Sequence, residues 1–259
     1  MPVGDSIRES KTGANAANLK PENFMKTLTT VLILGSSILH AQSPDAVSSA
    51  EIKKSPTPVR IMPVGDSITE GGGSFRVYRP LLAEKLKQAG FSVEFVGSKK
   101  DKANMAHEGY GGKSAQQIAK IVPANFRQHP ADIVLLHAGH NNFADKKPVP
   151  AIIAATESMI VEFRKTNPKV IVLLAQVIPS GLLPKYGYIP ELNQELAKLA
   201  ERLNSPDQPV LLVDHFTGFD PETDTVDDEV HPNASGGEKM AERWFQTLQP
   251  LLSSNAPAK

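Results

Sequence analysis

The stretch Val170-Ile171-Val172-Leu173-Leu174 decides the fold class of this chain, because it is apolar at every position. A strand exposed on one face alternates apolar and polar side chains, whereas a strand covered on both faces is apolar throughout. Ile133-Val134-Leu135-Leu136 has the same character. Both runs therefore predict central strands of a parallel sheet with helices on both faces.

Apolar segments of this kind alternate with helical patterns from Val59 onward. The expected strands are residues 59–64, 92–96, 131–137, 170–176 and 210–214, and the expected helices are residues 77–89, 114–121, 150–165, 190–203 and 234–251. Strand–helix alternation predicts an α/β fold, specifically a flavodoxin-like three-layer α/β/α domain with a five-stranded parallel sheet. In such folds the functional site lies at the carboxyl ends of the strands.

The composition excludes several classes of function. The chain has 259 residues, with 28 basic and 28 acidic side chains and no cysteine. A net charge of zero provides no overall field that would attract nucleic acid or an anionic membrane. The lack of cysteine excludes disulfides, a thiol nucleophile and cysteine-bound zinc.

Residues 1–58 are expected to precede the folded domain, which is placed at residues 59–255. Residues 25–41 resemble a signal peptide, with Lys26 ahead of an apolar stretch of about a dozen residues. Residues 42–58, rich in Ser, Pro and Ala, are interpreted as a linker. Residues 1–24 repeat the Met-Pro-Val-Gly-Asp-Ser-Ile of residues 62–68 and are interpreted as a non-native or misassigned extension.

These assignments predict a secreted or periplasmic protein that is free of the membrane after signal cleavage. The alternative is a buried or disordered N-terminal segment. The cleavage site and the oligomeric state stay open at this point.

The block Gly65-Asp66-Ser67-Ile68-Thr69 follows the first expected strand. A serine at a strand-to-helix turn can point its hydroxyl into a cleft and offer its backbone N–H to an oxyanion. The alternative is a helix N-cap, at which Ser and Asp are common. The three glycines at residues 71–73 lack the Lys-Ser/Thr of a phosphate-binding loop, so they are interpreted as a flexible turn.

The block Asp228-Glu229-Val230-His231-Pro232-Asn233 lies near the C-terminus. Pro232 keeps His231 out of a helix interior, and Asp228 is close enough in sequence to reach the imidazole. Asp227 is a rival for that role, and an acidic surface loop is the alternative. Together with Ser67, the block supplies the nucleophile, general base and orienting carboxylate of a serine hydrolase.

The block Gly139-His140-Asn141-Asn142 follows the most apolar strand. The Asn141 amide could donate a hydrogen bond to a developing oxyanion, although a strand-end turn is the alternative. His137 and His140 form a His-x-x-His pair, but His137 lies within the strand and a zinc site would need a third ligand. No metal or cofactor is expected.

These blocks, with His107-Glu108-Gly109-Tyr110-Gly111-Gly112 between the first and the third, occur in the order found in the SGNH, or GDSL-type, hydrolase superfamily. The chain resembles this superfamily from Arg60 to about Leu251. It is most similar to the secreted carbohydrate esterases that include acetylxylan esterases.

The resemblance implies a role for each matching residue. Ser67 would be the nucleophile, His231 the base and Asp228 the carboxylate that orients it. The oxyanion hole would consist of the Ser67 N–H, the Gly112 N–H and the Asn141 side chain.

Three departures from the family pattern affect these assignments. His140 and Asn142 replace a common Thr and Asp, Gly111 replaces the usual Ser, and Lys113 stands where an aromatic residue is frequent. The loop at residues 139–142 could therefore pack differently from its counterpart in the family, and the contacts with substrate could also differ.

The resemblance implies a serine esterase that removes short-chain, chiefly acetyl, groups from a carbohydrate through an acyl-enzyme. An acetylated polysaccharide or oligosaccharide would be its partner, and no cofactor is implied. The alternatives are a lipolytic or thioester-cleaving SGNH hydrolase and a non-catalytic carbohydrate-binding domain on the same fold.

Overall fold

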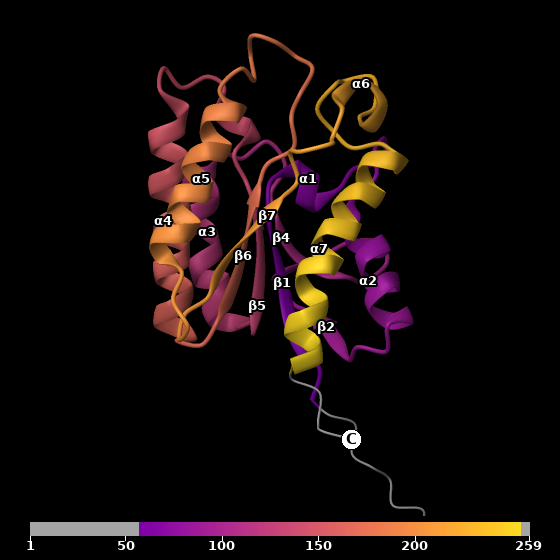
Figure 1. Cartoon of the computed structure of the whole chain (residues 1–259), viewed down its shortest axis with the longest axis vertical. Coiled ribbons are helices and arrows are strands. Elements are labelled where there is room, and N and C mark those ends of the chain that lie inside the picture. Colours follow the sequence, from indigo (N-terminus) through magenta and orange to yellow (C-terminus); the bar gives the residue numbers. More distant parts are fainter. Residues whose placement is uncertain (1–56, 255–259) are drawn as a thin grey trace, which may run out of the picture. The chain divides into compact units, whose positions relative to one another are not determined.

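The structure, a computed structural model, describes residues 57–254 (Figure 1). The expected extension (1–24), the signal peptide (25–41) and nearly all of the linker (42–58) lie outside the described residues. Within residues 57–254, no helix has both the length and the apolar character needed to cross a membrane.

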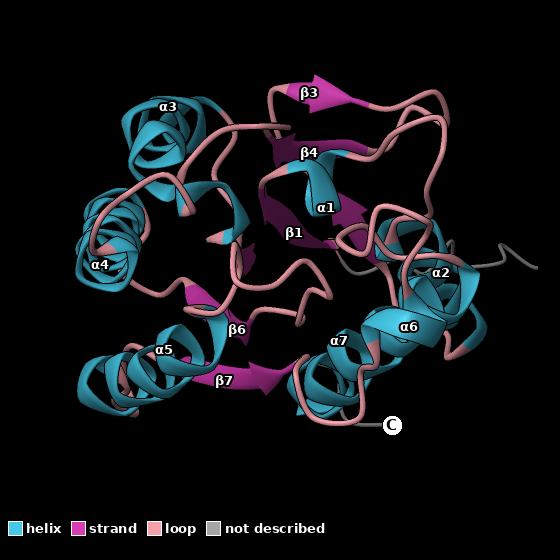
Figure 2. Cartoon of the chain, turned by 90° about the horizontal axis from the view of Figure 1, so that it is seen from above, coloured by secondary structure: helices cyan, strands magenta, loops and turns pink. Residues whose placement is uncertain are grey.

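A central sheet lies between two layers of helices (Figure 2). The strand order is β3-β4-β1-β5-β6-β7, and β2 also pairs with β1. The strands are β1 (Val59–Gly65), β2 (Val93–Phe95), β3 (Lys99–Lys100), β4 (Ala106–Gly109), β5 (Ile133–His137), β6 (Ile171–Gln176) and β7 (Val210–Asp214). The predicted parallel α/β/α fold is confirmed, because β2, β1, β5, β6 and β7 pair in parallel in the flavodoxin-like order.

Two short strands, β3 and β4, were not predicted. β2 pairs with Val59–Ile61 at the start of β1, whereas β4 pairs with Val64 and Gly65 at its end. β3 is antiparallel to β4. The β4 sequence Ala-His-Glu-Gly is fully buried yet has no apolar run, so it lacked the signal that identified the other strands.

The helices divide between the two faces of the sheet. In Figures 1 and 2, α3, α4 and α5 cover one face, and α2 and α7 cover the other. The helices are α1 (Ser67–Glu70), α2 (Tyr78–Gln88), α3 (Ala115–Gln128), α4 (Pro148–Thr166), α5 (Ile189–Leu203), α6 (Pro221–Asp224) and α7 (Ala234–Ser254), with a short 3₁₀ helix, η1 (His140–Asn142).

Helix α3 runs to Gln128, although the sequence predicted an end near residue 121. Pro123 lies inside this helix, although a proline disfavours helical backbone in the residue before it. Ile118, Val122 and Phe126 form one buried stripe across the proline. The free energy gained by burying these three side chains outweighs the cost of a proline inside the helix.

The core has one apolar cluster on each face of the sheet. Along β5, Val134 and Leu136 belong to the cluster under α3–α5, and Ile133 and Leu135 belong to the cluster under α2 and α7. Alternate side chains of a strand point to opposite faces, so an unbroken apolar strand fills both clusters. The helices on both faces are thereby packed against the sheet whose strand ends carry the candidate site.

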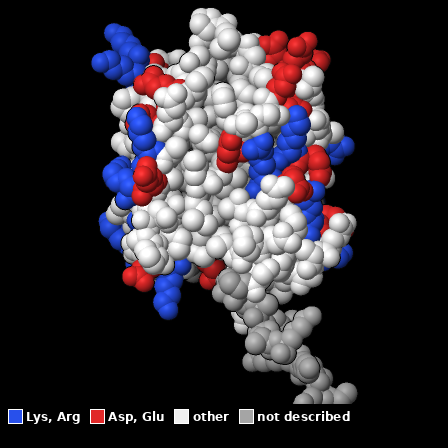
Figure 3. Space-filling model, in the orientation of Figure 1, with Lys and Arg blue, Asp and Glu red and all other residues white. Residues whose placement is uncertain are grey.

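Charged side chains of both signs are interspersed around the face seen in Figure 3, and a largely uncharged area lies between them. This distribution agrees with a net charge of zero. Any electrostatic recognition must therefore be local.

Gly65→Ala is expected to lower the free energy of unfolding by about 3 kcal/mol, because overpacking is destabilising. A Cβ at Gly65 would lie 2.2 Å from the His137 carbonyl oxygen and 2.4 Å from Thr69 Oγ1. Gly73→Ala is the matched control, since nothing lies within 4 Å of a Cβ there. Urea unfolding of both variants measures the difference, and equal stabilities would contradict the packing described for Gly65.

Candidate active site

Ser67 begins α1 immediately after β1 ends. Asp66, which is fully buried, caps the helix, because its Oδ1 accepts a hydrogen bond of 3.1 Å from the Ile68 N–H. The N-cap role considered for the serine thus falls to Asp66. The Ser67 hydroxyl is left free for another partner at the carboxyl end of the sheet.

His231 and Asp228 form a hydrogen-bonded chain with Ser67. Ser67 Oγ lies 2.8 Å from His231 Nε2, and His231 Nδ1 lies 2.6 Å from Asp228 Oδ2. With the Nδ1 proton donated to the carboxylate, Nε2 carries the lone pair that can accept the serine proton. The structure therefore brings together the three residues that the two sequence blocks proposed.

Asp228 is fixed by backbone as well as by the ring. Its Oδ1 accepts hydrogen bonds from the backbone N–H groups of His231 and Val230, at 2.8 and 2.9 Å. Burial alone would raise the pKa of Asp228, but hydrogen bonds from His231 and Val230 outweigh it and leave the pKa below its ordinary value. Asp227 makes no hydrogen bond to His231 in the described part of the chain.

Phe75 stacks on the imidazole, with ring centroids 4.2 Å apart and an angle of 24° between the planes. The ring of Phe75 covers one face of His231 and restricts its rotation. Sequence reasoning missed this residue, because a lone phenylalanine after a glycine run carries no signal of its own.

The block at residues 107–112 begins in β4 and continues into a loop beside Ser67. The Gly111 N–H donates to Glu70 Oε2 at 2.6 Å, and a Cβ at Gly111 would lie only 2.6 Å from that oxygen. A side chain at position 111 would therefore require the Glu70 carboxylate to shift. Gly112 has φ +72, a left-handed conformation that favours glycine.

Asn141 lies next to this loop. Its Nδ2 donates to the Lys113 carbonyl at 3.2 Å, which leaves the second amide hydrogen free to donate elsewhere. Among the hydrogen bonds of residues 57–254, none engages the N–H of Ser67 or of Gly112. These three groups are the donors that the sequence comparison assigned to an oxyanion hole.

The two departures around Asn141 have structural roles. Asn142 is buried, and its Oδ1 accepts a hydrogen bond from the Ala115 N–H at the start of α3. His140 donates from Nε2 to the Ile178 carbonyl at 2.9 Å. Tyr188 adds a hydroxyl that lies 2.7 Å from the Gly139 carbonyl oxygen, so η1 is held from three sides.

Asp66, His137 and His140 offer three buried ligand atoms within 4.8 Å of one another. Their hydrogen bonds do not suit a metal ion. The Ile178 N–H donates to His137 Nε2, which occupies that lone pair and places the ring proton on Nδ1. A protonated nitrogen has no lone pair for a metal, and only two ligand atoms remain.

Arg79 ties α1 to its surroundings and was not singled out from the sequence. Its side chain is fully buried and donates to the Thr69 and Glu70 carbonyls and to Asp101 Oδ2, all at 2.8–2.9 Å. It therefore satisfies carbonyls at the end of α1 that the helix itself leaves unpaired. A single arginine in an amphipathic helix looks like a surface residue, so the sequence carried no signal for this role.

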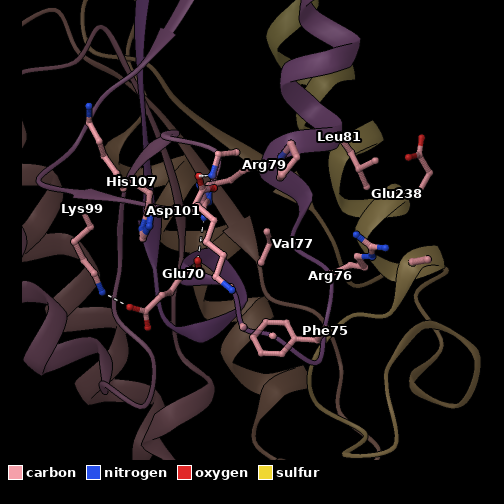
Figure 4. A pocket seen from close by; sticks show the side chains of 18 residues that line it. Glu70, Phe75, Arg76, Val77, Arg79, Leu81, Lys99, Asp101, His107 and Glu238 are labelled. Atoms are coloured by element: carbon pink, nitrogen blue, oxygen red, sulfur yellow. Dashed lines mark hydrogen bonds and ion pairs between the residues drawn. The ribbon is translucent and has the colours of Figure 1, made fainter.

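A cavity of about 970 Å³ opens beside α1 (Figure 4). Glu70, Phe75 and His107 are among the residues that line it. Burial, together with the charges of Arg79 and Lys99, lowers the pKa of His107 to about 4, so its ring is neutral near pH 7.

Comparison with protein families gives a match over residues 64–239 to the GDSL-like Lipase/Acylhydrolase family. A multidomain esterase from Ruminococcus flavefaciens is 26% identical over 228 residues, which cover 76% of this chain. The aligned part is 29% of that protein, so the chain spans less than a third of the length of this curated relative.

Solved structures of similar fold include three esterases. An acetyl esterase mutant with an acetate ion is 27% identical, with a TM-score of 0.68 over 76% of this chain and 100% of that one. A carbohydrate esterase family 3 protein from Talaromyces cellulolyticus is 28% identical, with a TM-score of 0.68 over 76% and 100% of the two chains. A Clostridium thermocellum family 3 carbohydrate esterase has the same identity and TM-score over 78% and 100%.

The free energy of unfolding is expected to fall as the pH drops from about 7 to about 5. Burial lowers the pKa of His107 to about 4 and that of His215 to about 3, and it also holds the pKa values of His137 and His140 below the ordinary range. The unfolded chain regains values near 6.5 and so binds more protons below that pH than the folded chain does.

Urea unfolding across this pH range measures the effect, and carboxylates contribute little to it because they titrate at lower pH. NMR titration of the histidine ring protons is the independent readout. A flat stability profile, or a His215 ring that titrates near pH 6.5, would contradict the expectation.

Proposed function

Because this chain belongs to the GDSL-like Lipase/Acylhydrolase family, we propose that it is a serine esterase that removes short acyl groups, chiefly acetyl, from a carbohydrate. The observation that carries the proposal is the hydrogen-bonded chain from Ser67 through His231 to Asp228, with distances of 2.8 and 2.6 Å. A nucleophile, its base and the orienting carboxylate must be in mutual reach before acyl transfer can occur.

In the proposed reaction, Ser67 Oγ attacks the ester carbonyl carbon while His231 Nε2 takes the hydroxyl proton. The negative charge that develops on the carbonyl oxygen is stabilised by the Ser67 and Gly112 N–H groups and the Asn141 amide. His231 then returns its proton to the departing alcohol. Water, deprotonated by the same ring, hydrolyses the acyl-enzyme and releases the acid.

Asp228 and Phe75 hold the base for these steps. The Asp228 carboxylate keeps the Nδ1 proton in place and stabilises the imidazolium that forms twice in each cycle. The stacked Phe75 ring limits rotation of the imidazole between the two proton transfers. Each proton-transfer step is therefore made by one ring in one orientation.

The substrate class is supported by the relatives. Two of the similar structures are family 3 carbohydrate esterases, and a third is an acetyl esterase solved with acetate. An acetylated polysaccharide or oligosaccharide is thus the proposed partner, and the signal-like residues 25–41 support a proposed site of action outside the cytoplasm.

Two alternatives fit less well. A lipolytic or thioester-cleaving enzyme is less well supported, because the similar structures at 27–28% identity are an acetyl esterase and two carbohydrate esterases. A non-catalytic carbohydrate-binding domain has no need for a serine aligned on a histidine and a carboxylate.

Purified protein is expected to hydrolyse para-nitrophenyl acetate, with rates that fall steeply beyond butyrate in a series up to octanoate. Ser67→Ala should lower kcat by about 10⁴-fold or more, because the nucleophile is lost. A serine-directed organophosphonate should label wild type once, at Ser67, and leave Ser67→Ala unlabelled.

Ser6→Ala is the matched control, since Ser6 stands in the same local sequence, Val-Gly-Asp-Ser-Ile. It should behave as wild type. Full activity in folded Ser67→Ala would overturn the assignment of the nucleophile, and a preference for octanoate over acetate would overturn the short-acyl specificity.

Asp228→Ala is expected to lower kcat by about 10²–10⁴-fold, because the imidazolium loses its carboxylate partner. The neighbouring Asp227→Ala should stay within about threefold of wild type, since this surface change is expected to alter stability by less than about 0.5 kcal/mol. Kinetics with para-nitrophenyl acetate rank the two variants. The opposite ranking would assign the orienting role to Asp227.

A further inference from the structure

The cavity beside α1 adjoins the proposed catalytic residues through Phe75 and Glu70. Phe75 lines the cavity and stacks on His231, and Glu70 lines it from the end of the short helix that begins at Ser67. Its volume of about 970 Å³ lies at the upper end of the range for ligand sites, far above what an acetyl group needs. It is therefore large enough for the sugar that carries the ester.

The charges in the cavity wall are predominantly positive. Five cationic side chains and three carboxylates line it, namely Arg76, Arg79, Lys99, Lys100 and Lys102 against Glu70, Asp101 and Glu238. All three carboxylates already have cationic partners: Lys99 for Glu70, Arg79 for Asp101, and Lys85, which lies outside the wall, for Glu238. None of the ion pairs found within residues 57–254 uses Arg76, Lys100 or Lys102.

Arg76 is placed closest to the catalytic loop. Its backbone N–H donates to the Pro232 carbonyl at 3.0 Å, directly after His231. Its Cβ would lie 3.4 Å from a Cβ at Gly237, so glycine at that position of α7 leaves room for the arginine stem. In Figure 4, Arg76 lies on the side of Glu238 and Leu81, across from Lys99 and Glu70.

The remaining wall is apolar. Phe75, Val77, Pro80 and Leu81 supply it, and the Phe75 ring lies between the two charged sides in Figure 4. A sugar ring presents C–H groups to such a surface and hydroxyl or acidic groups at its rim.

We infer that this cavity binds a carboxylate-bearing sugar next to the acetylated position, so that the enzyme acts on acidic glycans. The inference rests on the proposed esterase function for its catalytic consequence. Arg76 offers a planar fork that matches a carboxylate, and Lys100 and Lys102 add unpaired positive charge at the rim. A neutral glycan would leave these three cations without a partner.

The kinetic test compares two small esters, a mono-acetylated methyl glucuronoside and a mono-acetylated methyl xyloside, by acetate release. Wild type should have the higher kcat/KM for the glucuronoside at low salt, with the ratio falling toward one as salt screens the charge. Arg76→Gln should lower the ratio about tenfold, the loss expected for one charged hydrogen bond.

Lys120→Gln is the matched control, because it removes one positive charge from an exposed position on α3 outside the cavity wall. It should leave the ratio at the wild-type value. A wild-type ratio near one at low salt, or an equal fall in both variants, would overturn the inference.

Calorimetry with ester-free ligands separates the inference from the proposed function. An acidic xylo-oligosaccharide with one glucuronate should bind wild type about tenfold more tightly than its neutral counterpart. Activity on para-nitrophenyl acetate without this preference would leave the esterase proposal standing and overturn the inference. A preference for the acidic ligand without any ester hydrolysis would support the inference and overturn the esterase proposal. Tighter binding of a sulfated oligosaccharide would overturn carboxylate recognition and identify sulfate as the recognised group.

Discussion

The close approach of β1 to β5 at Gly65 is the constraint on which the active edge depends. Gly65 pairs with His137 on one side and with Gly109 on the other, so β1 is enclosed by strands up to its last residue. The chain must then leave the sheet at once, and Asp66 caps a helix that starts with Ser67. The serine is thereby held at a fixed height above the sheet, where a loop 164 residues further along the chain can reach it.

The serine and the base are held by different means. Ser67 gains its position from the sheet, whereas His231 gains its position from hydrogen bonds within its loop and from the Phe75 ring. Arg79 links the helix that begins at Ser67 to the cavity, since it binds the end of α1 and also Asp101 in the cavity wall. Catalytic geometry and the shape of the cavity therefore share one buried guanidinium.

The sequence predicted best what depends on neighbours along the chain. Apolar runs identified β5 and β6, and the spacing of Asp228 and His231 indicated a contact within one loop that the structure contains. Prediction from the sequence failed where residues far apart in the chain determine the local structure. β4 is a strand because β1 leaves half of an edge open, and the Gly111 N–H finds its partner in the Glu70 carboxylate, 41 residues earlier in the chain. Phe75 and Arg79 likewise acquire their roles only when the chain has folded.

The three glycines at residues 71–73 separate the helix that begins at Ser67 from residues that line the adjoining cavity. α1 ends at Glu70, and Phe75, Arg76 and Val77 follow the glycines into the wall of the cavity. A Cβ at Gly73 would meet nothing, whereas a Cβ at Gly72 would lie 2.4 Å from the Phe75 ring, so Gly73 is the position that can vary freely. An exchange at this one position would therefore alter the approach of the chain to the cavity wall, while the strands that position Ser67 stay as they are.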